Sequence, residues 1–234
     1  LLEREVTGLE RVVYTPRAPF VVVIGGAKME TKIPVIKNLL SKADYILVGG
    51  GILNTYLKAM KYGVGDSLVD AAFTTEALAY GKKRKVIWPV DVVVGSRDGI
   101  RARLPDRQAR VVEIGKKPHL ICKKGEGIYD IGPRSILRFA GYIKKAQTLV
   151  WNGAMGYFEQ KPYDVATLSV ARLIASRSKG KAYGVIGGGE TLQAMGMVGM
   201  SEWVDLVSTG GGAMLEFLAG GELPGIVALT KRRK

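Results

Sequence analysis

Cysteine and histidine are almost absent from this sequence of 234 residues. The single cysteine, Cys122, cannot form an internal disulfide, and the single histidine, His119, excludes any site that requires two histidines. A disulfide-stapled secreted protein is therefore excluded, and we expect a reducing, cytoplasmic compartment. No apolar run approaches the roughly 18 residues of a membrane span, so we expect no membrane partner. The chain also lacks an initiating methionine and a signal peptide, and we expect it to be a piece of a longer protein.

Acidic residues are scarce relative to basic ones. The sequence has 35 Lys and Arg against 21 Asp and Glu, a net charge of +14, with 47% hydrophobic and 24% charged residues as in ordinary globular proteins. Such a charge attracts nucleic acid or small phosphorylated ligands, or is simply a solvated surface. Aromatic residues do not alternate with the basic runs, as they do in platforms for single strands. We expect no nucleic-acid partner, and a basic nucleic-acid-binding scaffold is kept as an alternative.

Short β-branched runs alternate with longer amphipathic stretches along almost the whole chain. The runs are continuously apolar, which is typical of strands covered by helices on both faces. Repeated strand–helix–strand order predicts right-handed crossovers and a parallel sheet. We therefore predict an α/β fold with three αβα layers around a doubly wound, Rossmann-like sheet. Its six predicted strands span residues 20–24, 45–48, 86–88, 148–151, 182–186 and 204–207.

Amphipathic periodicity predicts helices between these strands, over residues 33–41, 70–83, 135–145, 166–176 and 191–198. Residues 96–131 interrupt the alternation, and for this polar segment we predict irregular structure with one short strand at 111–114. No linker rich in Pro, Gly or Ser divides the chain, so we predict one domain. His119 and Cys122 lie in the polar segment without a partner pattern and are assigned no chemistry.

Glycines cluster directly after four of the predicted strands. The carboxyl ends of parallel strands share one edge of a sheet, where ligand crevices form. Glycine there lets main-chain N–H groups approach a phosphate, and the N-terminus of the following helix favours negative charge. Tight turns that need a positive φ would also explain any single cluster. The clusters are Gly25-Gly26, Gly49-Gly50-Gly51, Gly187-Gly188-Gly189 and Gly210-Gly211-Gly212.

The phosphate hypothesis depends on side chains near the glycines, because neither a P-loop nor a Gly-x-Gly-x-x-Gly pattern is present. Lys28 and Lys32 are four residues apart, which predicts two ammonium groups on one face at a helix start; two solvated lysines are the alternative. Glu190 and Thr191 offer the carboxylate and hydroxyl that Mg²⁺ needs beside a phosphate, although both also suit helix capping. Glu159 either accepts from ribose hydroxyls or faces solvent.

Seven motifs follow one another in a fixed order. They are Gly25-Gly26-Ala27-Lys28 with Lys32, Gly49-Gly50-Gly51, the stretch from Trp88 to Val94, Asp130-Ile131-Gly132-Pro133, Trp151-Asn152-Gly153, Gly187-Gly188-Gly189-Glu190-Thr191 and Ser208-Thr209-Gly210-Gly211-Gly212-Ala213. Leu223-Pro224-Gly225 follows them. In type and order these motifs resemble the C-terminal half of phosphoglycerate kinase, and the resemblance covers essentially the whole chain.

The resemblance implies reversible phosphoryl transfer between 1,3-bisphosphoglycerate and ADP, giving 3-phosphoglycerate and ATP, as in glycolysis. It implies that residues 1–19 link the chain to a missing N-terminal lobe, which binds 3-phosphoglycerate in this family. Residues 20–234 would then form the nucleotide-binding domain, with ADP or ATP and Mg²⁺ as ligands. We expect a monomer that binds nucleotide but turns over negligibly by itself.

The resemblance also implies residue roles. It places Lys32, Gly210, Gly211 and Gly212 at the transferring phosphoryl group and makes Glu190 the ligand of Mg²⁺. The other nucleotide-binding residues that it implies are Gly26, Lys28, Gly49, Gly50, Gly51, Asn152, Glu159, Gly188, Gly189 and Thr191. Three positions depart from the family pattern, because Glu190 and Thr31 stand where Asp is usual and Ala154 replaces a proline. The extra methylene of Glu190 moves its carboxylate outward.

A dinucleotide-binding oxidoreductase is the alternative enzyme class, because a doubly wound sheet with glycine turns also serves that function. Such a site needs an acidic residue about 20 positions after a single glycine fingerprint. Asp44 lies near that spacing from Gly25 and Gly26, but the fingerprint itself differs.

Overall fold

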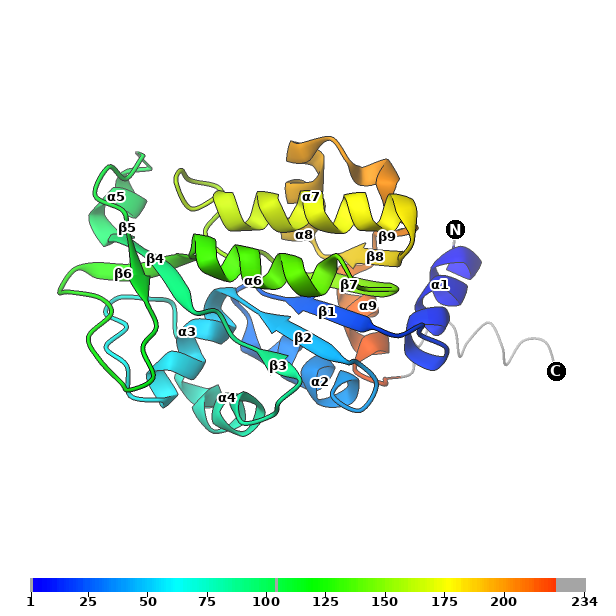
Figure 1. The fold of residues 1–234 in the computed structure, drawn as a ribbon, viewed down its shortest axis with the longest axis horizontal. Coiled ribbons are helices and arrows are strands. Elements are labelled where there is room, and N and C mark those ends of the chain that lie inside the picture. The colour runs from blue at the N-terminus through cyan, green and yellow to red at the C-terminus, as the bar shows by residue number, and fades with distance from the viewer. Residues whose placement is uncertain (1, 104, 222–234) are drawn as a thin grey trace.

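The computed structural model describes residues 2–103 and 105–221 (Figure 1). Its central sheet contains six parallel strands. The strand order is β3-β2-β1-β7-β8-β9, so the chain moves outward from β1 in one direction and, after β7, in the other. This order confirms the predicted doubly wound, six-stranded sheet, and every predicted strand is present within two residues at each end. The strands are β1 (Phe20–Ile24), β2 (Tyr45–Val48), β3 (Val86–Ile87), β7 (Thr148–Asn152), β8 (Tyr183–Gly187) and β9 (Leu206–Ser208).

The central strands are continuously apolar because both faces of the sheet are covered. All five residues of β1 are buried. Successive residues point to opposite faces of a strand, and accordingly Val21 and Val23 join one hydrophobic cluster while Phe20, Val22 and Ile24 join another. The sheet therefore separates two halves of the core.

Helices form the two outer layers of the predicted αβα arrangement (Figure 1). One layer contains α6 (Pro133–Ile143), α7 (Val165–Gly180) and α8 (Gly189–Val198), and the other contains α1 (Leu2–Tyr14), α2 (Met29–Leu39) and α9 (Gly211–Leu218). Helix α3 (Gly50–Ala59) follows β2 and packs against α4 (Thr74–Gly81). Short helical segments complete the described chain at α5 (Arg97–Ala102), Ala71–Phe73 and Ser201–Trp203.

A second sheet occupies the segment for which irregular structure is predicted from the sequence. Strands β4 (Asp91–Ser96), β5 (Arg110–Glu113) and β6 (Glu126–Ile131) pair antiparallel in the order β5-β4-β6. The prediction for residues 96–131 is therefore wrong except for the strand near 111–114. Glycine and acidic residues interrupt the apolar pattern of β4 and β6, and long-range pairing rather than local propensity stabilises such strands.

Two buried aspartates attach the small sheet to helices of the large one. Asp91 of β4 accepts hydrogen bonds from the main-chain N–H groups of Arg134 and Ser135, at 3.0 and 2.8 Å, in the first turn of α6. Asp130 of β6 accepts from the N–H group of Ala166, at 3.0 Å, in the first turn of α7. Helix N-termini favour negative charge, although burial raises the pKa of the Asp130 carboxyl well above its usual value.

Helix α1 contributes Leu9, Val12 and Val13 to the same cluster as Phe20 of β1. The division of the chain at residue 19 stays a prediction. Among the described residues, no helix combines the length and the apolar character that crossing a membrane requires. The motif Leu223-Pro224-Gly225 lies outside the described residues.

Candidate functional site

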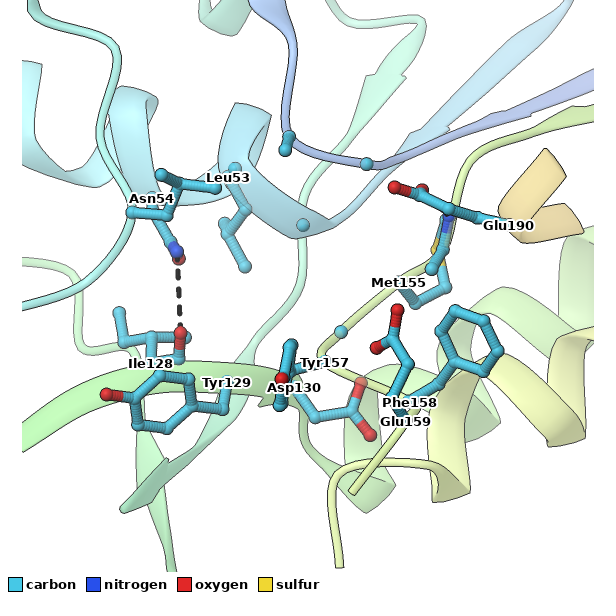
Figure 2. A pocket seen from close by; sticks show the side chains of 17 residues that line it. Leu53, Asn54, Ile128, Tyr129, Asp130, Met155, Tyr157, Phe158, Glu159 and Glu190 are labelled. Atoms are coloured by element: carbon cyan, nitrogen blue, oxygen red, sulfur yellow. Dashed lines mark hydrogen bonds between the residues drawn. The ribbon is translucent and has the colours of Figure 1, made fainter. Parts of the chain in front are cut away.

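A cavity of about 310 Å³ lies at the carboxyl edge of the large sheet, beside β6 of the small sheet (Figure 2). The loops after β1, β2 and β7 and the first turns of α3 line one part of it, and β6 lines another. Its walls are mostly apolar, with Leu53, Leu68, Ile128, Met155 and Phe158 among the lining residues. A flat, largely apolar ligand portion fits such a space.

Polar groups gather at two separate places along this cavity. Glu159 and Glu190 lie toward one side in Figure 2, whereas Asn54 and Tyr129 lie toward the other. Glu159 and Glu190 are both exposed. The side of the cavity with these two exposed glutamates is its acidic mouth, and the buried carboxyl of Asp130 also lines the wall.

The glycine loops that bound the cavity are joined to one another through their main chains. The N–H group of Gly26 donates to the carbonyl of Ala154 at 2.7 Å, that of Gly50 to Met155 at 2.9 Å, and that of Gly51 to Gly26 at 2.9 Å. These amides are engaged within the protein, so Gly26, Gly50 and Gly51 shape the cavity wall rather than donate to a phosphate.

The close packing of these loops explains why glycine is required. Gly50 has a φ of +60°, and a Cβ atom there would lie 2.7 Å from the nitrogen of Gly26. Gly49 is buried behind the wall, donates to the carbonyl of Ile24 at 3.1 Å, and does not line the cavity.

Lys28 and Lys32 occupy different environments, which corrects the prediction that both share a helix face. Lys28 has an extended backbone at the N-cap of α2 and is exposed, so helical spacing does not apply to it. Lys32 lies inside the helix and is only 7% exposed. Burial lowers the pKa of the Lys32 ammonium to about 8, and the Glu190 carboxylate opposes this shift.

Asn152 connects Lys32 to the loop after β8. The Lys32 ammonium donates to the Oδ1 atom of Asn152, and the Nδ2 atom of Asn152 donates to the carbonyl of Gly187 at 2.7 Å. Gly188 follows with a φ of +95°, and a Cβ atom there would lie 3.0 Å from Asn152 Nδ2. The buried cation is therefore held beside the N-terminus of α8.

Glu190 is exposed, whereas its neighbour Thr191 is buried. The Oε2 atom of Glu190 accepts a 3.3 Å hydrogen bond from the N–H group of Ala154 at the mouth of the cavity. Thr191 is fully buried, and its hydroxyl accepts from the N–H group of Gly153 at 2.7 Å. Gly188, with no side chain, is the N-cap of α8. Thr191 therefore positions the Gly153 loop instead of capping the helix or facing a ligand.

The N-termini of α8 and α9 lie side by side. A Cβ atom on Gly211 would lie 3.1 Å from the Cα atom of Gly188. Gly210 is the N-cap of α9, so this glycine cluster leads into a helix, as expected for glycines that follow a strand of a parallel sheet. N–H groups in the first turn of a helix favour an anion, so the two helix ends and the Lys32 ammonium form a candidate anion-binding region, with the Glu190 carboxylate in the first turn of α8.

Glu5 of α1 fixes the segment that leads into α9. Its carboxylate accepts from the N–H group and the hydroxyl of Thr209, at 3.1 and 2.9 Å, and from the Ser208 hydroxyl at 3.4 Å. Sequence reasoning missed Glu5, because nothing local links a first-turn glutamate to a loop two hundred residues later.

Comparison with known proteins assigns this arrangement to a family. Residues 1–221 match the family model described as phosphoglycerate kinase. The chain belongs to the phosphoglycerate kinase family. The resemblance stated from the sequence motifs is thereby confirmed.

Named relatives and solved structures agree with this family assignment. The chain is 41% identical to phosphoglycerate kinase of Chloroflexus aurantiacus, over 98% of this chain and 56% of that protein. It superimposes on phosphoglycerate kinase from Coxiella burnetii with a TM-score of 0.87 and 38% identity, covering 100% of this chain and 58% of that one. The enzyme from Pyrococcus horikoshii gives a TM-score of 0.80 and 28% identity, with coverages of 98% and 56%. The chain thus spans about half the length of these relatives.

The phosphoglycerate kinase family implies Mg²⁺, and the residues present fit a metal carried by phosphate. Among residues 2–103 and 105–221, no group of three or more His, Cys, Asp or Glu side chains could enclose an ion. Mg²⁺ commonly takes one or two carboxylates and completes its shell with water and phosphate oxygens. Glu190 is exposed at the cavity mouth and offers one such carboxylate.

The structure brings the sequence-predicted residues of this phosphoglycerate kinase family member into two adjoining groups. Gly26, Gly50, Gly51, Glu159 and Glu190 line the cavity. Lys32, Asn152, Gly188 and Gly210–Gly212 form the candidate anion-binding region. Their roles toward a ligand stay predictions. Asn54 and Asp130 also line the cavity but are not among the predicted site residues, because their positions inside α3 and β6 give no local sign that their side chains reach a ligand.

Proposed function

We propose that this chain is the nucleotide-binding half of a phosphoglycerate kinase, which transfers a phosphoryl group reversibly between 1,3-bisphosphoglycerate and ADP. The cavity takes the adenine ring, and Glu159 accepts from the ribose hydroxyls. The phosphates extend from Glu190 toward Lys32 and the ends of α8 and α9. The observation that carries this proposal is the apolar cavity next to a buried lysine and two adjoining helix N-termini in a member of this family.

In phosphoryl transfer the protein mainly positions the reactants and stabilises the charge of the transferring group. With a pKa of about 8, the Lys32 ammonium is charged near neutral pH. A phosphate oxygen replaces Asn152 Oδ1 as the acceptor of this ammonium, which then offsets the negative charge of the transferring group. Glu190 would hold Mg²⁺, which would supply further positive charge at the phosphate oxygens.

We propose that a second lobe, outside these 234 residues, binds 3-phosphoglycerate and closes over the nucleotide to exclude water. Effective transfer requires the two reactants to be held in register. This chain alone therefore binds nucleotide and turns over negligibly.

Titration calorimetry with Mg-ADP tests the binding half of this proposal. We expect saturable heat from the unaltered chain, at least tenfold weaker binding for Lys32→Met, and unchanged binding for Lys37→Met, which removes an exposed charge from the same helix. Absence of binding by the unaltered chain would defeat the proposal.

A coupled kinase assay tests the turnover half. We expect negligible activity from the chain alone and a gain when the N-terminal lobe of a phosphoglycerate kinase is added. High activity without that lobe would show that both substrate sites lie within this chain.

The alternatives receive no support from the family assignment. An oxidoreductase would be stabilised by NAD rather than by Mg-ADP, and a nucleic-acid scaffold would bind polyanions with a steep salt dependence that Lys32→Met leaves unaltered. Thermal shift with each ligand separates these cases.

A further inference from the structure

Asn54 is a buried amide at the wall of the cavity. It lies in α3, is 4% exposed, and its Oδ1 atom is buried without a hydrogen-bond partner among the described residues. The two other buried unpartnered side-chain atoms in the described chain belong to Glu76 and Ser178, which do not line the cavity. A buried acceptor without a donor costs free energy, and a ligand donor in the adjacent space would remove that cost.

The other half of the amide is held only weakly. Its Nδ2 atom donates to the carbonyl of Ile128 at 3.5 Å (Figure 2). This separation is long for a hydrogen bond, so the contact only weakly restrains rotation of the amide about its Cβ–Cγ bond, which has a broad torsional preference. Oδ1 is therefore the acceptor at Asn54 that has no donor within the described chain, and it matches a ligand N–H group such as that of a primary amine.

The position of Asn54 selects which part of a ligand it meets. In Figure 2 it lies across the cavity from Glu159 and Glu190. A nucleotide whose phosphates lie toward Glu190 therefore directs the far edge of its base toward Asn54. Asp130, which also lines the cavity, already accepts hydrogen bonds from two main-chain N–H groups. Much of the remaining wall is apolar and cannot distinguish polar substituents.

We propose that Asn54 selects the base, by accepting a hydrogen bond from the exocyclic amino group of a 6-aminopurine nucleotide. This assignment rests on the proposed function of the cavity. It makes Asn54 a specificity-determining residue that acts on binding, with no part in the phosphoryl transfer itself.

Four dissociation constants test the assignment. Mg-ADP and the Mg complex of purine riboside diphosphate, which lacks only the 6-amino group, are titrated into the unaltered chain and into Asn54→Leu. We expect the unaltered chain to bind Mg-ADP about five- to tenfold more tightly, as one relieved hydrogen bond implies. In Asn54→Leu this ratio falls to about one. A ratio that persists in the variant would overturn the assignment.

Leu68→Ala is the matched control, because Leu68 lines the same cavity and is 58% exposed. It should weaken both ligands equally and keep their ratio. If Asn54→Leu does not fold, the unaltered chain still decides, since equal affinity for the two ligands refutes the assignment while the proposed function stands. Failure of both ligands to bind would refute the proposed function and this assignment together.

Discussion

Lys32 carries a charge that the fold encloses. An ammonium in a lysine of the unfolded chain has a pKa near 10.5, whereas burial lowers the pKa of Lys32 to about 8. Between these values the unfolded chain holds a proton that the folded chain has released. The free energy of unfolding therefore rises as the pH increases from 8 to 10.5, and this gain is lost as the pH falls through 8.

We predict that the unaltered chain gains about 1–2 kcal/mol of stability relative to Lys32→Met between pH 7.5 and 9.5. The difference between the two proteins isolates Lys32 from other groups that titrate in this range. Urea unfolding at both pH values measures it, and Lys37→Met should follow the unaltered chain. Parallel pH profiles for the unaltered chain and Lys32→Met would contradict the prediction.

At the scale of elements, buried carboxylates of the small sheet join it to the first turns of α6 and α7. Asp91 is 1% exposed and accepts from two N–H groups of α6. We predict that Asp91→Ala lowers the free energy of unfolding by about 2–4 kcal/mol, because both amides lose their acceptor. Asp98→Ala, in the exposed first turn of α5, should change it by less than about 0.5 kcal/mol. Chemical denaturation compares the two, and equal effects would contradict the capping role.

Helix α1 is tied to α9 through Glu5. We predict that Glu5→Ala destabilises the chain by about 1 kcal/mol and speeds amide hydrogen exchange at Thr209, whose N–H group loses its acceptor. Glu3 is exposed in the same first turn, so Glu3→Ala should leave exchange at Thr209 unchanged. Unaltered exchange in Glu5→Ala would show that the contact contributes nothing.

The elements divide into those that sequence patterns reveal and those that they do not. Strands such as β1 and β7 are predictable because burial on both faces demands an unbroken apolar run. Strand β6 combines Glu126, Gly127 and Asp130 with apolar residues, and its stability comes from pairing with β4 more than thirty residues earlier. Local β-propensity does not reveal a pairing partner so far away in the sequence, so the second sheet could not be predicted.

On the scale of the whole molecule, ligand binding should raise the free energy of unfolding. A ligand that binds only the folded chain stabilises it by about 2.7 kcal/mol at one hundred times its dissociation constant. For a chain of this size we predict that Mg-ADP at that level raises the melting temperature by about 5–10 °C. Differential scanning calorimetry measures this shift. An equal shift with NAD would contradict a site built for a nucleoside di- or triphosphate.

The site as a whole was only partly predictable. Glycines after strands located the correct edge of the sheet, because strand direction alone determines where those loops lie. The contacts that each of these site residues makes were harder to predict. The Gly26 and Gly50 amides are consumed between loops, Thr191 supports Gly153, and Lys28 and Lys32 differ in burial because a helix starts between them. Such details depend on which partners the folded chain brings together.

The joined loops after β1, β2 and β7 also bear on how this site can change over evolutionary time. Their mutual contacts run from main chain to main chain, so exchanging the side chains around them leaves the hydrogen-bonding pattern intact. Remodelling that side of the cavity would require insertions or deletions, which shift several loops at once. Altered ligand preference is therefore easiest to acquire from α3 and β6, where single codon changes alter what the cavity presents.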